Sequence, residues 1–138
     1  MARVLVCGSR EWTDTGAIRA ELAALPPGSM VIHGDNGYDA EGHPLWGQPD
    51  ALAVRGADKL AGAITRELGL AVEVYLPDWK THGRGAGPKR NQRMLEEGKP
   101  DQSLAFTHNL AGSRGTADMV RRLRAAGVPV RMVDETSE

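Results

Sequence analysis

Cysteine, phenylalanine and long apolar runs are scarce in this chain. Cys7 is the single cysteine, which excludes an internal disulfide and favours a reducing cytoplasm as the location. The apolar run at the N-terminus is too short for a signal peptide, and no stretch approaches the length of a membrane span. With one Phe and 4% aromatic residues, the core must consist mainly of Val, Leu, Ile, Ala and Met. We therefore expect a cytoplasmic protein with no membrane partner.

A strong net charge is also lacking, because 17 Lys and Arg face 18 Asp and Glu, for a net charge of −1. This balance argues against a protein whose main task is to bind a nucleic-acid backbone, and we expect no stable binding of nucleic acid. The charges are nevertheless uneven. Ten Lys and Arg face four acids between Arg84 and Arg131, whereas residues 35–54 hold four acids and no Lys or Arg. A basic half in a nearly neutral protein suits a small polyanion better than a long one.

What the chain does have is a regular alternation of apolar runs and helical stripes. The runs that predict strands are Arg3–Cys7, Met30–His33, Ala71–Leu76, Leu104–Phe106 and Val128–Val133. Helices are predicted between them: one capped by Thr13 or Asp14, one over Gly56–Leu68, one starting at Pro88 and one after Gly115. The alternation predicts a single α/β domain over residues 1–138. We expect a Rossmann-like, three-layer fold with about five parallel strands in the order 3-2-1-4-5.

Two segments stand outside this pattern. Residues 134–138 are expected to form a loose tail, and residues 35–54 form a long insert after the second strand. Four side chains of the insert invite a metal hypothesis: Asp35, Asp39, Glu41 and His43. Their spacing matches neither a calcium loop nor a zinc motif, so we predict no metal and no cofactor. We interpret the insert as a mobile flap in which Tyr38 or Trp46 covers a ligand.

Two glycine-containing turns point to an anion site. Gly112–Thr116 joins the fourth predicted strand to the last helix, and Gly8-Ser9-Arg10 follows the first strand. A glycine-rich turn before a helix leaves backbone N–H groups beside the positive end of the helix dipole, where phosphate binds readily. If strands one and four are neighbours, both turns flank the crevice at the switch point of strand order. The alternative is that the glycines merely shape tight strand-to-helix connections.

Charged and aromatic residues beside these turns extend the predicted site. Arg10 and Arg90 would neutralise phosphate, because guanidinium groups bind it well. Asp58 would accept hydrogen bonds from ribose, and Trp12 or Trp79 would stack on the base. The full set of expected ligand contacts is Gly8, Ser9, Arg10, Trp12, Gly34, Arg55, Gly56, Asp58, Trp79, Arg90, Asn91, Gly112, Ser113, Gly115 and Thr116.

Several of these residues also have a structural interpretation. Trp12 could pack on the edge of the sheet, and Asp58 could simply favour the start of its helix. Arg90 could pair with an acid such as Asp118. We interpret His33 as a buried histidine with satisfied hydrogen bonds, and Cys7 as a small buried residue.

Taken together, the sequence resembles the SLOG superfamily, and specifically the small YpsA-related SLOG proteins of bacteria and phages. The resembling motifs are Gly8-Ser9-Arg10-x-Trp12, Val31–Gly34, Arg55–Asp58, Asp78-Trp79, Ala86-Gly87-Pro88-x-Arg90-Asn91-x-x-Met94 and Gly115-Thr116-x-Asp118-Met119. The resemblance implies a Rossmann-like sheet that binds a nucleotide derivative, such as a nucleoside monophosphate or an ADP-ribose-type ligand. It is also compatible with a homodimer.

The lonely-guy phosphoribohydrolases, which release a base from a nucleoside monophosphate, belong to the same superfamily. The position of their catalytic Glu falls on Met119, which cannot transfer a proton, and Asp118 lies one residue away. The Arg that resembles their catalytic one is Arg90. Two functions therefore stay open. One is the binding of a nucleotide derivative, for sensing or sequestration. The other is cleavage of an N-glycosidic bond, with Arg90 orienting the phosphate and Asp118 stabilising the sugar cation.

The insert is a second departure from the family pattern. Similar proteins pass almost directly from His-Gly to Arg-Gly-Ala-Asp, whereas here residues 35–54 intervene. The resemblance therefore implies no role for this segment.

Overall fold

The computed structural model describes residues 2–133 and contains one parallel sheet of five strands. The strands are β1 (Arg3–Gly8), β2 (Met30–His33), β3 (Ala71–Val74), β4 (Gln102–Phe106) and β5 (Val130–Val133). Their order is β3-β2-β1-β4-β5 and all neighbours run parallel, which confirms the predicted fold class and strand order. The expected loose tail, residues 134–138, lies outside the described residues.

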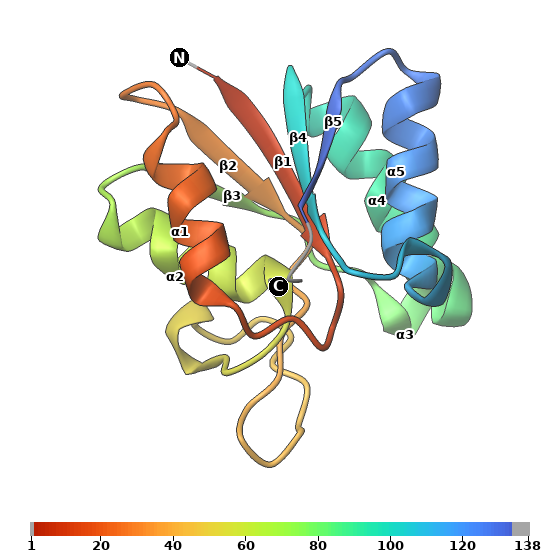
Figure 1. Ribbon diagram of the computed structural model, residues 1–138. Coiled ribbons are helices and arrows are strands. Elements are labelled where there is room, and N and C mark those ends of the chain that lie inside the picture. The colour runs from red at the N-terminus through yellow and green to blue at the C-terminus, as the bar shows by residue number, and fades with distance from the viewer. Residues whose placement is uncertain (1, 134–138) are drawn as a thin grey trace.

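Helices cover both faces of the sheet, as Figure 1 shows. Helices α1 (Thr15–Ala23) and α2 (Ala57–Glu67) lie on one face, and α4 (Ala86–Gly98) and α5 (Arg114–Ala125) lie on the other. Shorter elements lie in the loops: η1 (Asp50–Leu52), α3 (Trp79–His82), η2 (Gly83–Gly85) and η3 (Leu110–Gly112). Within residues 2–133, the helices are all too short or too polar to cross a lipid bilayer.

Each face of the sheet has its own apolar core, and β1 contributes to both. Val4 and Val6 pack with α1 and α2, whereas Leu5 and Cys7 pack on the side of α4 and α5. This alternation follows from the two-residue period of a strand, and burial on both faces is typical of a central parallel strand. Cys7 is 5% exposed, which confirms its interpretation as a small buried residue, and this burial raises the pKa of its thiol well above the ordinary value.

The element boundaries differ from the predicted ones by a few residues. Asp14 rather than Thr13 caps α1, because its carboxylate accepts a hydrogen bond from the backbone N–H of Ala17 at 3.0 Å. Helix α4 begins at Ala86, two residues before the expected Pro88. Proline is tolerated there because the N–H groups of a first helical turn lack intrahelical acceptors in any case.

All five strands end at the same edge of the sheet. The insert, α3 and the starts of α4 and α5 gather along this carboxyl edge (Figure 1). The residues predicted to bind a ligand come from these loops and helix starts, so the fold brings most of them to one side of the molecule.

Candidate functional site at the carboxyl edge of the sheet

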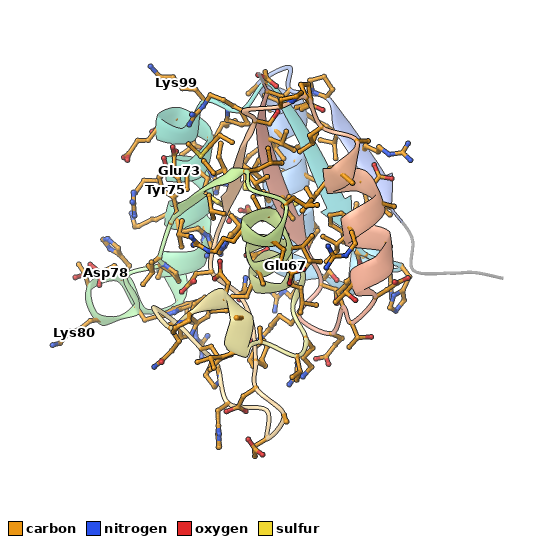
Figure 2. All side chains as sticks on the ribbon, turned by 90° about the vertical axis from the view of Figure 1, so that its left-hand side faces the viewer. Glu67, Glu73, Tyr75, Asp78, Lys80 and Lys99 are labelled. Atoms are coloured by element: carbon orange, nitrogen blue, oxygen red, sulfur yellow. The ribbon has the colours of Figure 1, made fainter. Side chains whose placement is uncertain are left out.

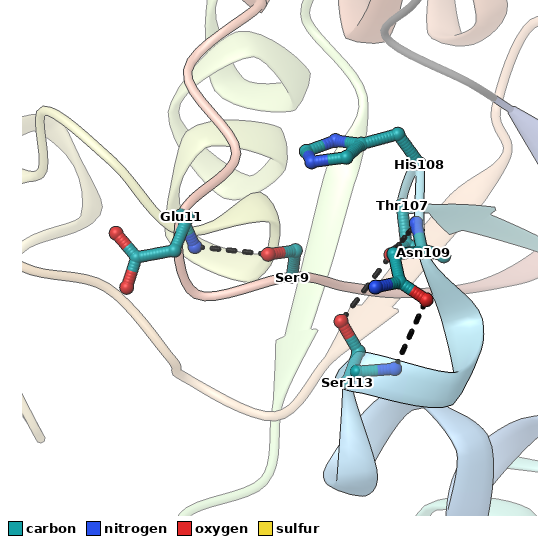
Figure 3. A pocket seen from close by; sticks show the side chains of 7 residues that line it. Ser9, Glu11, Thr107, His108, Asn109 and Ser113 are labelled. Carbon is teal, nitrogen blue, oxygen red and sulfur yellow. Dashed lines mark hydrogen bonds between the residues drawn. The ribbon is translucent and has the colours of Figure 1, made fainter.

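A hollow of about 170 Å³ lies between the turns that follow β1 and β4 (Figure 3). The residues that line this β1–β4 hollow are Ser9, Glu11, Thr107, His108, Asn109, Gly112 and Ser113. The two predicted turns therefore do face one crevice, as expected from the neighbouring positions of β1 and β4. Pockets for drug-sized ligands are roughly 300–1,000 Å³. The hollow can thus hold a phosphate or a sugar, but not a whole nucleotide.

The turn after β1 uses its own polar groups to hold its shape. The N–H of Ser9 donates to the Phe106 carbonyl at 2.9 Å, and its hydroxyl accepts from the Glu11 N–H at 3.0 Å. A Cβ on Gly8 would lie 2.5 Å from the Phe106 oxygen and 2.6 Å from the Ala57 Cβ. Close packing therefore explains Gly8, and the Ser9 N–H is already used within the protein. The contribution of this turn to the hollow comes from the side chains of Ser9 and Glu11.

The turn after β4 is different, because the start of α5 is open. Ser113, the residue before the helix, makes no side-chain hydrogen bond to it, and the first turn contains no acid. The Ser113 hydroxyl lies 3.2 Å from that of Thr107 instead. Among the described residues 2–133, a Cβ on Gly115 would meet nothing within 4 Å, and Thr116 follows it in the same turn. Within residues 2–133, the first turn of α5 thus has no side-chain cap for its N–H groups, and there is free space at the exposed Gly115.

Arg114 adds a positive charge at this helix start. Its side chain is exposed, and within residues 2–133 it forms no ion pair. A cation at a helix N-terminus is unfavourable because it opposes the helix dipole. An anion bound at this position would remove that repulsion.

The two arginines expected to neutralise phosphate do not line the hollow. Arg10 lies 3.4 Å from the Tyr38 hydroxyl, at the base of the insert. Arg55 stacks 4.3 Å from the Tyr38 ring centroid and pairs with Glu11 at 3.2 Å. The Glu11 carboxylate accordingly points away from the turn after β4 (Figure 3). Neither Arg10 nor Arg90 lines the hollow, so the predicted neutralisation of a phosphate by these two arginines gains no support from its lining.

Arg90 instead joins α4 to the end of β2. It is 6% exposed, donates to the Gly34 carbonyl, and donates from Nε to the Asn91 side chain at 3.0 Å. Burial lowers the pKa of Arg90, against the negative charges of Asp58 and Asp35. A Cβ on Gly34 would lie 2.7 Å from the Arg90 guanidinium, so glycine is required there by the arginine. Any contact of Arg90 with a ligand stays a prediction.

Two further predicted ligand residues are part of the protein interior. Trp12 is fully buried, packs edge-on against Phe106 with 5.5 Å between ring centroids, and donates from Nε1 to the Asp14 carbonyl. Its predicted stacking on a base is therefore wrong, and the alternative of packing on the sheet is right. Asp58 is 4% exposed and accepts from the Asn36 N–H at 3.2 Å. Burial raises the pKa of this carboxyl, and nothing in its position supports contact with ribose.

Gly56 is explained in the same way as Gly8. Its φ of 103° lies in the region that favours glycine, and a Cβ there would approach the Gly37 Cα to 2.8 Å. Gly56 is also buried; its N–H donates to the Trp12 carbonyl at 2.9 Å, and its carbonyl accepts from the Leu60 N–H in α2 at 3.2 Å. Its predicted contact with a ligand gains no support.

Asn91 connects α4 with α5. Its side-chain amide donates to the Asp118 carboxylate at 2.9 Å and to the Gly115 carbonyl at 3.3 Å. Asp118 also accepts from Arg122 at 2.8 Å and from Arg121. The alternative pairing of Arg90 with Asp118 is therefore wrong.

The catalytic role of Asp118 stays a prediction. Burial opposes its ionisation, but the hydrogen bonds from Arg122 and Asn91 outweigh this and lower the pKa of Asp118. The carboxylate is therefore ionised at neutral pH. Met119, which the resemblance aligned with the catalytic Glu of the phosphoribohydrolases, is 1% exposed and belongs to the apolar core.

A buried ion cluster, which was not predicted from the sequence, holds both ends of the insert. The Lys59 ammonium has no exposed side-chain surface and donates to Asp35 at 2.7 Å, to the Gln48 carbonyl at 2.6 Å and to Asp50 at 3.4 Å. His33 accepts from the Asp35 N–H through Nδ1, so its Nε2 donates to Asp50 at 3.1 Å. His33 is thus a buried, satisfied histidine, as interpreted. The acid excess of residues 35–54 was the available signal, because buried acids require a cation from elsewhere.

The exposed tip of the insert brings together part of the set that invited a metal hypothesis. The ligand atoms of Asp39, Glu41 and His43 lie within 4.8 Å of one another. The fourth residue, Asp35, is instead bound to Lys59. The Asp39 carboxylate already accepts the N–H groups of Glu41 and His43. The mobility of the insert stays a prediction.

Trp79 of the predicted site contacts Trp46 of the insert, which is half-buried. Trp46 in the insert and Trp79 at the start of α3 have ring centroids 5.5 Å apart. Trp79 retains 42% of its surface exposed. The insert therefore places an aromatic pair beside α3 rather than over the β1–β4 hollow.

Four residues that line the hollow are not among those predicted from the sequence. Thr107, His108 and Asn109 directly follow β4, and Glu11 lies two residues beyond Ser9. The available signal was position, because side chains just beyond the carboxyl ends of parallel strands line the crevice at the switch point. Their residue types alone gave no comparable indication.

Comparison with known proteins places the chain in a family. No protein-family model matches it. The Gene 61 protein of Mycobacterium phage D29 is 34% identical over 139 residues, which cover 94% of each of the two chains. The chain belongs to the family of this Gene 61 protein.

Solved structures that resemble this Gene 61 family member share its fold. One is TcdA (CsdL), and another is E. coli tRNA N6-threonylcarbamoyladenosine dehydratase, TcdA, in complex with AMP. Each has a TM-score of 0.52 and 12% identity, over 95% and 94% of this chain respectively. The chain spans about half the length of these TcdA chains, 49% in each case. At this identity the likeness establishes a Rossmann-like α/β fold.

Proposed function

We propose that this Gene 61 family member binds a phosphate-bearing nucleotide derivative, with the phosphate at the start of α5 and the adjacent sugar in the β1–β4 hollow. The open first turn of α5 supports this most strongly. It lacks a side-chain cap and an acid, it carries the unpaired Arg114, and it has free space at Gly115, all within residues 2–133. Backbone N–H groups together with a guanidinium form a strong anion site.

The lining of the hollow fits the part of a nucleotide next to its phosphate. Ser9, Thr107 and Ser113 offer hydroxyls, and Asn109 offers an amide that can both donate and accept hydrogen bonds. These groups match sugar hydroxyls and phosphate oxygens. A volume of about 170 Å³ leaves the base outside the hollow. A nucleoside monophosphate or an ADP-ribose-type ligand meets these requirements, and the AMP bound to a TcdA of the same fold is in keeping with them.

We further propose that the chain is a YpsA-related SLOG protein, consisting of one domain that senses or sequesters its ligand. The strand order and the motif set support the SLOG assignment. The phage origin of the Gene 61 relative favours sequestration of a signalling nucleotide. Binding without base release is favoured over glycosidic cleavage, because Asp118 is held by three side chains and Met119 is in the core.

Titration calorimetry with AMP and with ADP-ribose tests the proposal. Gly115→Ala fills the free space at the start of α5, and Arg114→Glu reverses its charge. We expect Arg114→Glu to weaken binding at least about tenfold, because hydrogen bonds to charged groups contribute about 1.5–3 kcal/mol. Gly16→Ala is the matched control, since Gly16 is also the second residue of its helix and a Cβ there makes only an ordinary contact of 3.4 Å with Asp14.

Two outcomes would contradict the proposal. One is that neither ligand binds the unaltered protein. The other is that Gly115→Ala and Arg114→Glu bind the ligand as tightly as Gly16→Ala does. This result would mean that the phosphate does not bind at the start of α5. Chromatography of the same mixtures separates binding from catalysis, because release of free base would establish the glycosidic cleavage that we consider less supported.

A further inference from the structure

The segment from Trp79 to Leu95 contains five Lys and Arg and no Asp or Glu. Two of the five are engaged: Arg90 is buried, and Arg93 pairs with Glu97 at 3.6 Å. The other three are exposed and form no ion pair within residues 2–133: Lys80, Arg84 and Lys89. They lie on α3, on η2 and at the beginning of α4. The carboxyl edge thus carries three unneutralised cations on consecutive elements.

The segment that carries these cations also carries a partly exposed tryptophan, Trp79. A Cβ on Gly87 would be 3.9 Å from the Trp79 ring, so the ring lies against the start of α4. Trp46 contacts Trp79 from the insert, and Trp79 is 42% exposed. We name Trp79, Lys80, Arg84, Lys89 and Trp46 the α3–α4 patch. Figure 2 shows Lys80 extending away from the body of the protein.

The acid next to the patch is partly used within the protein. Asp78 caps α3, and its carboxylate accepts from the Thr81 N–H at 3.1 Å. Hydrogen bonds from Thr81 lower the pKa of Asp78, so it carries one negative charge beside three positive ones. The patch therefore keeps a net positive charge.

We propose that the α3–α4 patch binds a short single-stranded segment of nucleic acid. Proteins bind single strands by stacking bases on aromatic rings and by holding the backbone with cations, and the patch supplies both. Charge alone would equally suit an acidic protein, but a partly exposed tryptophan on the same segment as the cations favours bases over carboxylates. The overall charge of −1 limits the strength of this binding rather than preventing it. The binding is therefore weak and depends strongly on salt, in keeping with our expectation of no stable complex.

The number of cations sets the expected salt dependence. For single strands, the logarithm of the affinity falls with that of the salt concentration with a slope of about −0.7 for each phosphate contacted. Three contacts give a slope of about −2, so affinity should fall roughly 20-fold between about 50 mM and about 200 mM salt. This proposal does not depend on nucleotide binding in the β1–β4 hollow, because the two sites use different residues.

Fluorescence anisotropy of a labelled oligothymidylate of about 12 nucleotides tests the proposal. We expect Trp79→Ala to weaken binding about fivefold or more, because stacking of a base contributes about 1–3 kcal/mol. Lys80→Glu and Lys89→Glu should each weaken binding and flatten the salt dependence. The matched control is Arg124→Glu, at the exposed opposite end of α5, which should leave both unchanged. Thermal melting of every variant verifies that it folds. If Trp79→Ala does not fold, the variants Lys80→Glu and Lys89→Glu still test the proposal.

Several outcomes would overturn the proposal. One is that the oligonucleotide does not bind at about 50 mM salt. Another is that Arg124→Glu and Lys89→Glu lose the same amount of affinity for the oligonucleotide. Competition by polyglutamate as effective as that by unlabelled oligonucleotide, with no effect of Trp79→Ala, would identify an acidic protein as the partner. Titration of Gly115→Ala with AMP is independent of these results, so failure of one proposal is distinguishable from failure of the other.

Discussion

Replacing Lys59 by Met should be among the most damaging single substitutions in this protein. The ammonium is fully buried and binds two carboxylates, of Asp35 and Asp50, whose side chains are 3% and 4% exposed. Methionine has a similar length but no charge, so the substitution leaves two buried carboxylates without their main cation. Removal of one partner from a buried ion pair costs about 3–5 kcal/mol.

The surroundings of Asp50 place the cost near the lower end of this range. Asp50 keeps the hydrogen bond with His33 at 3.1 Å and lies 3.5 Å from Arg66, whereas Asp35 loses its cationic partner. We therefore expect a loss of about 3 kcal/mol, from a total stability of about 5–15 kcal/mol for a domain of ordinary size. With about 4 °C for each kcal/mol, the melting temperature should fall by roughly 12 °C.

Urea denaturation followed by circular dichroism measures this loss. With a slope of about 2 kcal/mol per molar urea, the midpoint should fall by about 1.5 M. Lys89→Met is the matched control and should change stability by less than about 0.5 kcal/mol, because Lys89 is exposed. Adding Asp35→Asn to Lys59→Met should restore at least about 1 kcal/mol, since it removes the unpaired charge. A loss below about 1 kcal/mol, or no recovery in the double variant, would refute the reasoning.

Two further predictions concern other parts of the molecule. Gly8→Ala should destabilise the protein by about 1–3 kcal/mol, because its Cβ would lie 2.5 Å from the Phe106 carbonyl oxygen. Gly115→Ala should not destabilise the protein. Equal losses of stability for the two variants in urea denaturation would contradict this prediction. Burial and the hydrogen bond to Glu73 raise the pKa of Tyr75 to about 12, so absorbance of the phenolate should show a tyrosine ionising near that pH, absent in Tyr75→Phe. Because this pKa is raised, the contribution of Tyr75 to stability is complete below about pH 10 and is lost as the pH rises towards 12.

The fold was predictable from the sequence because its signals are local. The run of Val and Leu from Arg3 to Cys7 matches a strand buried on both faces, and the stripe of Leu60, Ile64 and Leu68 matches a helix with one apolar side. Alternation of such segments then restricts the chain to a parallel sheet covered on both faces. The common crevice of the turns after β1 and β4 followed from strand order, and the lining of the hollow confirms it.

The details of the site were less predictable because they depend on contacts between distant residues. A tryptophan just after a strand end can either pack in the core or stack on a ligand's base. For Trp12, only the contact with Phe106 shows that it packs in the core. The partner of Arg90 is a backbone carbonyl 56 residues away in sequence, which no side-chain pattern encodes. Lys59 binds Asp35 across 24 residues, and the sequence contains no periodic feature that marks such a pair.

The attachment of the insert at both of its ends has an evolutionary consequence. Lys59 binds Asp35, the Gln48 carbonyl and Asp50, so the two ends of the insert are anchored to α2 independently of the residues at its tip. Exposed loop tips with polar residues tolerate insertions well. Residues 40–43, all exposed at the tip, are thus a position where related proteins can acquire new sequence, and new specificity, without having to evolve a new scaffold.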